Sequence, residues 1–100
     1  MKSPEQCQNI AEVRHAIDFI DNKIVKLIAE RGKYVKRASV FKTSEAAVKD
    51  VDRVAEVIKS KKMLAVKYHT SEDLVERIYS TMINYFVDSE LDEWKSTRHE

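Results

Sequence analysis

Apolar residues recur at every third or fourth position from residue 10 onward, which is the spacing of one face of an α-helix. This apolar stripe consists of Ile10, Val13, Ile17, Ile20, Ile24, Leu27, Tyr34, Ala38 and Phe41. Asn9 followed by Glu12 is typical of a capping box at a helix start, and no Pro interrupts the stripe. The pattern predicts one long helix over about residues 9–42, with a short turn before it at residues 3–6 and a partly ordered polar connection after it at residues 43–49.

The predicted first helix is too long for one compact copy of the chain. At a rise of 1.5 Å per residue it extends roughly 50 Å, whereas a compact chain of 100 residues is only about 30–35 Å across. An apolar stripe that leaves its own globule is unfavourable in water. Because a second copy of the chain wrapped against the first would cover the stripe, we expect an intertwined homodimer.

Two further helices are predicted, over about residues 50–66 and 70–94. Asp50 is placed to cap the first of them, and Thr70 with Asp73 has the spacing of a capping box at the start of the other. Both segments carry apolar residues at helical spacing. The fold class expected from the pattern is therefore all-α, with three helices and a very long first one.

Composition narrows the function classes and favours a single domain spanning residues 1–100. One Gly and one Pro leave few tight turns, and a net charge of +1 indicates neither a nucleic-acid nor a membrane partner. The single Cys7 cannot form an intramolecular disulfide, which agrees with a cytoplasmic location. His15, His69 and His99 lack metal-ligand spacing, so we assign them surface roles and expect no metal.

Charged residues interrupt the apolar stripes at positions where a core is expected. Arg31 lies within the first stripe, with Arg14 and Lys42 near its two ends, and Glu90 lies on the apolar side of the third helix. A buried charge is expensive unless it is paired or meets an anionic ligand. The pattern alone leaves two interpretations open. Either these are ordinary surface side chains, some of them in ion pairs, or they line a polar pocket that binds an anion.

A three-helix chain with Arg14, Arg31 and Lys42 at these separations resembles the all-helical, AroQ-type chorismate mutases. The segment over residues 39–48, SVFKTSEAAV, is similar to the isochorismate-pyruvate lyase branch of that family, which makes salicylate for siderophores. The chain's first and last residues also resemble this branch, so the similarity covers essentially the whole sequence. The resemblance implies a homodimeric lyase that takes a small dicarboxylate and needs no cofactor.

The resemblance implies a role for each matching residue. Arg14 would reach into the partner subunit's site and bind a carboxylate, and Arg31 would bind the enolpyruvyl carboxylate. Lys42 would contact a carboxylate and the ether oxygen, where it would stabilise the charge that develops on bond cleavage. Arg53 would lie near the ring carboxylate. Glu90 falls where many members carry Gln as a donor to the ether oxygen, so an acid-shifted activity optimum is expected.

Two positions of the expected pocket resemble different branches of the family. Asp50 matches a mutase residue that contacts the ring hydroxyl, whereas Val54 is apolar as in the lyase branch. The first alternative is therefore a chorismate mutase that forms prephenate, and weak mutase activity is expected even from a lyase. The second alternative is a non-catalytic helical dimerisation module.

Overall fold

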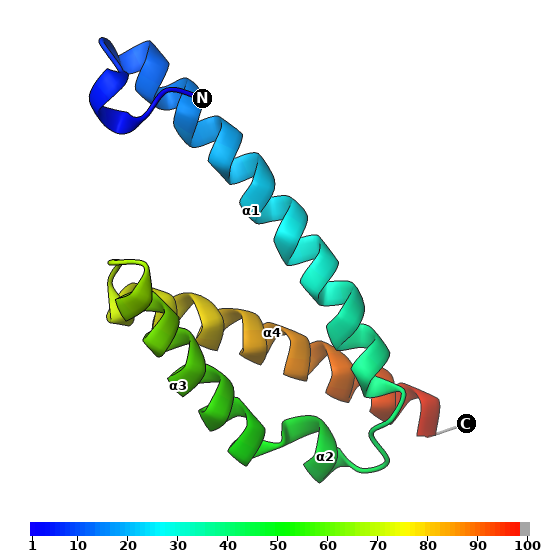
Figure 1. Cartoon of the computed structure of the whole chain (residues 1–100). Coiled ribbons are helices and arrows are strands. Elements are labelled where there is room, and N and C mark those ends of the chain that lie inside the picture. The colour runs from blue at the N-terminus through cyan, green and yellow to red at the C-terminus, as the bar shows by residue number, and fades with distance from the viewer. Residues whose placement is uncertain (99–100) are drawn as a thin grey trace. The chain divides into compact units, whose positions relative to one another are not determined.

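The computed structural model describes residues 1–98, and in that range every regular element is a helix (Figure 1). The elements are a 3-10 helix at Pro4–Gln6, α1 at Ile10–Ser39, α2 at Glu45–Lys49, α3 at Val51–Lys67 and α4 at Glu72–Arg98. The all-α fold with a very long first helix is confirmed. The short helix α2 is additional, and it occupies most of the segment that was expected to be a connection.

The chain forms two compact units, Met1–Tyr34 and Val35–Glu100. In the first unit, Asn9 caps α1 by accepting a hydrogen bond from the Glu12 N–H at 2.8 Å. The expected capping box is corrected in one detail, because the Glu12 carboxylate accepts the N–H of Gln8 at 2.9 Å and not that of Asn9. The 3-10 helix at Pro4–Gln6 lies within the short turn predicted at residues 3–6.

Helix α1 ends at Ser39, three residues earlier than expected. The N–H groups of Val40, Phe41 and Lys42 each bond to a carbonyl three residues back, at 3.1–3.2 Å, and the α-helical ladder stops there. The Ser39 hydroxyl also donates to the Lys36 carbonyl at 2.6 Å, a local bond that competes with the helix ladder. The chain therefore turns just before Lys42.

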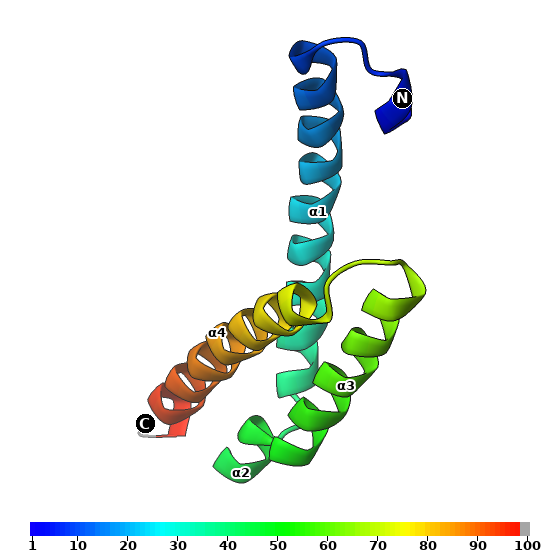
Figure 2. The same ribbon diagram turned by 90° about the vertical axis from the view of Figure 1, so that its left-hand side faces the viewer.

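In the second unit, α3 packs against α4, and a short turn joins them (Figure 2). His69 takes a left-handed backbone with φ 58°, and the Thr70 N–H bonds to the Ala65 carbonyl at 2.9 Å, which is the bonding of a Schellman cap. The predicted cap at Thr70 is wrong. Ser71 caps α4 instead, because the Schellman cap uses Thr70 and Ser71 accepts the Leu74 N–H at 3.1 Å.

Few apolar side chains are covered within the single chain. Val48, Ala65 and Ile83 are buried, while α1 has no buried residue. The large apolar side chains exposed on α1 are Ile10, Val13, Ile17, Phe19, Ile20, Ile24, Val25, Leu27, Ile28 and Tyr34. None of the described helices combines the length and apolarity needed to cross a membrane.

Candidate active site

Lys42 and Glu90 meet in the second unit although 48 positions separate them in the chain. The Lys42 ammonium donates to Glu90 Oε2 at 3.0 Å. Lys42 leaves the turn after α1, whereas Glu90 comes from the C-terminal half of α4. The two charged residues that were expected in a pocket are therefore in direct contact.

The Glu90 carboxylate is the buried member of this pair. Glu90 is 7% exposed and the Lys42 side chain 27% exposed, so Lys42 is the member of the pair that solvent reaches. Taking a carboxylate out of water is costly, and a cation in hydrogen-bonding contact offsets much of that cost. An anionic ligand that approached Lys42 would therefore compete with Glu90 for the ammonium.

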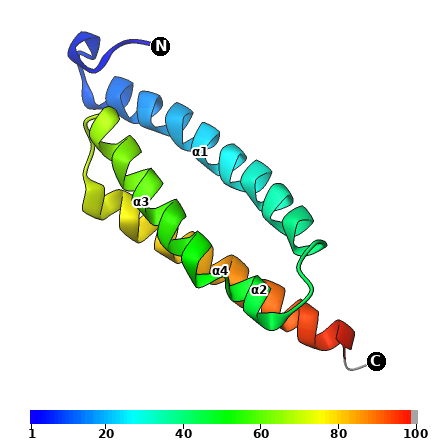
Figure 3. The same ribbon diagram turned by 60° about the horizontal axis from the view of Figure 1, so that its bottom comes forward.

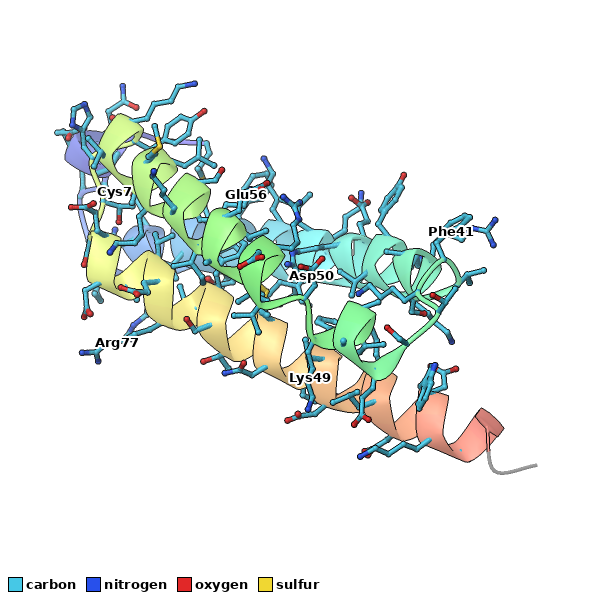
Figure 4. All side chains as sticks on the ribbon, turned by 90° about the horizontal axis from the view of Figure 1, so that it is seen from below. Cys7, Phe41, Lys49, Asp50, Glu56 and Arg77 are labelled. Carbon is cyan, nitrogen blue, oxygen red and sulfur yellow. The ribbon has the colours of Figure 1, made fainter. Side chains whose placement is uncertain are left out.

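Asp50 lies where α2 ends and α3 begins, and Figure 4 labels it at that junction. Its backbone has a left-handed φ of 27°, and its Oδ1 atom accepts the Arg53 N–H at 3.2 Å. The predicted N-cap is thus confirmed. The second carboxylate oxygen takes no part in this cap, so capping leaves one oxygen of Asp50 for a ligand.

Among the described residues, Arg53 pairs with Glu56 and not with Lys42 or Glu90. Its guanidinium bonds to Glu56 one turn further along α3, at 2.5 Å, and both side chains are largely exposed. An exposed ion pair of this kind contributes about 0–1 kcal/mol. Arg53 can therefore exchange Glu56 for an anionic ligand at little cost.

Arg14 and Arg31 belong to the first compact unit. Arg14 is exposed on α1, and Arg31 is half-buried. Half-burial of Arg31 agrees with its place in the apolar stripe. Their predicted roles toward a shared ligand stay predictions.

The sequence interpretation missed the anchoring of α2. Val48 is 3% exposed, and the Glu45 carboxylate lies 3.6 Å from the Lys95 ammonium on α4. Ser44 was the available signal, because it caps α2 by accepting the Ala47 N–H at 3.1 Å. The segment after Lys42 is therefore a docked helix.

Two open grooves of the described residues are lined by side chains other than Lys42 and Glu90. One, of about 600 Å³, is lined on α3 and the start of α4 by Ala55, Ile58, Lys59, Lys62, Met63, Val66 and Glu72. The other, of about 590 Å³, is lined in the first unit by Met1, Lys2, Asn9, Ala11, Glu12, His15, Ala16 and Phe19. Neither groove includes a predicted site residue.

Metal-binding side chains do not cluster in the described part of the chain, where no three His, Cys, Asp or Glu residues are placed to hold an ion. His15 and His69 are exposed, in agreement with the surface roles predicted for them. His99 lies outside the described residues. No metal or cofactor site is assigned.

The chain is similar in sequence to one protein family and to two relatives of known activity. The family model described as chorismate mutase type II matches residues 13–91. An isochorismate pyruvate lyase from Pseudomonas aeruginosa is 37% identical over 98 residues, which are 98% of this chain and 97% of the relative. A chorismate mutase from Methanocaldococcus jannaschii is 30% identical over 79 residues, which are 78% of this chain and 80% of the relative.

Proposed function

Because the chain belongs to the chorismate mutase type II family, we propose that it is an isochorismate pyruvate lyase that acts as a cytoplasmic homodimer. It eliminates pyruvate from isochorismate and leaves salicylate, a precursor of siderophores. The observation that carries this proposal is the end-to-end similarity to the Pseudomonas lyase, which extends beyond the family match at both ends. The ammonium of Lys42 is the group of the second unit best suited to the chemistry.

The proposed reaction breaks the carbon–oxygen ether bond of isochorismate. A hydrogen moves from the ring to the enolpyruvyl carbon as the bond breaks, so pyruvate and salicylate together contain all the atoms of the substrate. Negative charge grows on the departing enolpyruvyl oxygen. A cation held beside this oxygen stabilises the transition state more than the ground state.

The proposed substrate contacts come from named cations. Lys42 would meet the ether oxygen and a carboxylate, while Arg31 and Arg53 would bind the carboxylates in planar, bidentate geometry. This clamp would fold the flexible substrate into its reactive conformer. The exposed Arg53–Glu56 pair and the partly exposed side chain of Lys42 support these assignments, because an incoming anion can approach both residues.

The homodimer is part of this proposal. The apolar side chains exposed along α1 and the groove of about 600 Å³ on α3 are surfaces that a second copy would cover. Arg14 is exposed on α1 and would complete the partner subunit's site. The two sites of the dimer would then each use residues from both chains.

A second candidate function is chorismate mutase activity, in which the same clamp leads to carbon–carbon bond formation and prephenate. Asp50 favours it, because its free carboxylate oxygen can accept a hydrogen bond from a ring hydroxyl. The apolar Val54 and the segment over residues 39–48 favour the lyase. A non-catalytic dimerisation module is the least supported alternative, because it gives no reason for a buried Glu90 paired with Lys42.

The proposal is tested by incubating the purified protein separately with isochorismate and chorismate and identifying the products by chromatography. We expect pyruvate and salicylate from isochorismate, and at most slow formation of prephenate from chorismate. In Lys42→Ala, loss of the cation at the ether oxygen should lower the lyase rate by about a hundredfold or more, while the dimer persists.

The matched control is Lys67→Ala, which removes an exposed lysine at the end of α3 in the same unit. This variant should keep the wild-type rate. Prephenate as the main product would favour the mutase instead, and undiminished turnover in Lys42→Ala would remove Lys42 from the mechanism.

A further inference from the structure

The short helix α2 follows Lys42 after only two residues and packs on the helix that carries Glu90. Figure 3 shows α2 beside the C-terminal half of α4, and the two helices are in contact. Val48 of α2 is 3% exposed, which makes it one of the most buried side chains described. Apolar packing therefore anchors the chain to α4 a short distance after Lys42.

Both ends of α2 are held as well. At its start, the Glu45 carboxylate lies 3.6 Å from the Lys95 ammonium of α4. At its end, the Asp50 N–H donates to the Ala46 carbonyl at 2.9 Å, and Asp50 then caps α3. Helix α2 is therefore tied to α4 by the buried Val48 and by the Glu45–Lys95 pair, and at its other end it leads directly into α3.

The position of the Lys42 ammonium depends on where its backbone is held. A lysine side chain is a flexible four-carbon stem, so it does not fix the charge by itself. On the N-terminal side, the Lys42 N–H donates to the Ser39 carbonyl at 3.1 Å. On the C-terminal side, the first tertiary anchor is α2.

We propose that Val48 is a positioning residue for the lyase reaction and acts through Lys42. By docking α2 on α4, Val48 holds the Lys42 backbone where the ammonium reaches Glu90 and the bound substrate. Val48 itself touches no substrate. This inference rests on the proposed function for its kinetic consequence, but the geometry that it describes exists without substrate.

The first experiment needs no substrate. Lysines are reductively methylated with carbon-13 formaldehyde, and the Lys42 signal is assigned by its absence in Lys42→Arg. In Glu90→Gln this signal should move, because the facing carboxylate is gone. Val48→Ala should move it in the same direction, and Val48→Ile, which keeps the branched apolar shape, should restore it.

Val57→Ala is the control, because Val57 is also half-buried in the second unit but lies on α3. It should leave the Lys42 signal in place. Glu45→Lys breaks the largely exposed pair with Lys95, so it should shift the Lys42 signal less than Val48→Ala does. The double variant Glu45→Lys/Lys95→Glu restores a pair of opposite charges and should return the signal to its wild-type position. A Lys42 signal unmoved by Val48→Ala would overturn the positioning role.

The second experiment is kinetic. Val48→Ala should lower kcat for isochorismate by about ten- to hundredfold, the loss expected from misplacing a catalytic group by about 1 Å, while KM changes less than about threefold. In a Lys42→Gln background the same substitution should change kcat by less than about twofold. Equal losses in both backgrounds would mean that Val48 does not act through Lys42.

The two experiments separate this inference from the proposed function. A wild-type protein without turnover of isochorismate would overturn the proposed lyase activity. The Lys42 signal would still decide whether Val48 positions the ammonium.

Discussion

Glu90 and Lys42 hold opposite charges 3.0 Å apart in a place where one of them is shielded from water. Before substrate binds, Glu90 satisfies the ammonium. When a dianionic substrate approaches, an ionised Glu90 competes with it and repels charge that grows on the ether oxygen. A neutral hydrogen-bond donor at this position would instead stabilise that charge. The charge of the group at position 90 therefore controls how well Lys42 serves the reaction.

We predict that Glu90→Gln raises the lyase rate at neutral pH. A carboxylate beside the ether oxygen opposes the charge that develops there, whereas the amide of Gln donates a hydrogen bond to it, so the rate should rise by about tenfold. The measurement is the lyase rate of both proteins in the same neutral buffer at constant ionic strength.

Glu76→Gln is the matched control for this comparison, because it removes a carboxylate that pairs with a lysine on the surface. Its rate should equal that of the wild-type protein. A Glu90→Gln rate no higher than the wild-type rate would mean that Glu90 only neutralises Lys42.

Among the elements, the start of α1 shows how local hydrogen bonds set a helix end and its pH response. The Gln8 N–H, and after it the Lys2 ammonium, hold the pKa of Glu12 below its ordinary value of 4.5. A carboxyl with a lowered pKa stabilises the folded segment above its ordinary pKa, and this stabilisation is lost as the pH falls through the lowered value. The turn before α1 is therefore sensitive to acid.

We predict that acid loosens residues 1–8 through Glu12. The amide signal of Gln8 in NMR spectra should titrate with a midpoint below the ordinary pKa of 4.5, because it reports the bond to the carboxylate. Glu12→Gln keeps an acceptor oxygen but no charge, so this titration should disappear. Glu5→Gln is the control and should leave it intact. A Gln8 midpoint at the ordinary value would contradict the contact.

For the whole molecule, the central question is what covers α1. Its apolar side chains are exposed in the single chain, and an exposed stripe of this size is a typical protein–protein contact surface. In a two-fold symmetric dimer each surface meets its own copy. Covering α1 in this way would also bring Arg14 of one chain toward the site of the other, as proposed.

We predict that two inactive variants complement each other in mixed dimers. Arg14→Ala and Lys42→Ala alone should each be strongly impaired. After unfolding and refolding together in equal amounts, they should recover about a quarter of the wild-type rate, because half of the dimers are mixed and each mixed dimer has one intact site. Lyase rate and light scattering check activity and dimer formation.

Arg14→Ala mixed with Arg14→Ala/Lys42→Ala is the control, since no mixed dimer of this pair has an intact site. It should recover nothing. If the first mixture also recovers nothing while its dimers form, Arg14 and Lys42 act within the same chain.

The sequence alone determined what depends on near neighbours. Helical periodicity and the caps at Asn9 and Asp50 involve residues within about four positions, so these elements were predictable. The position of Glu90 on the apolar side of its helix was also predictable, but its burial was one of two possibilities that the pattern left open. The residue that caps α4 was not predictable from the sequence. The Thr70 N–H bonds to the Ala65 carbonyl in the turn at His69, so the next residue, Ser71, is the one that caps α4.

Only the tertiary structure decided which distant groups meet. The contact of Lys42 with Glu90 and the docking of α2 through Val48 join segments far apart in the chain. Such contacts form because packing of α2 and α3 on α4 offsets the entropy of closing the intervening loops. No local pattern encodes that balance, so the sequence predicted that Lys42 and Glu90 were unusual, and the fold decided that they are partners.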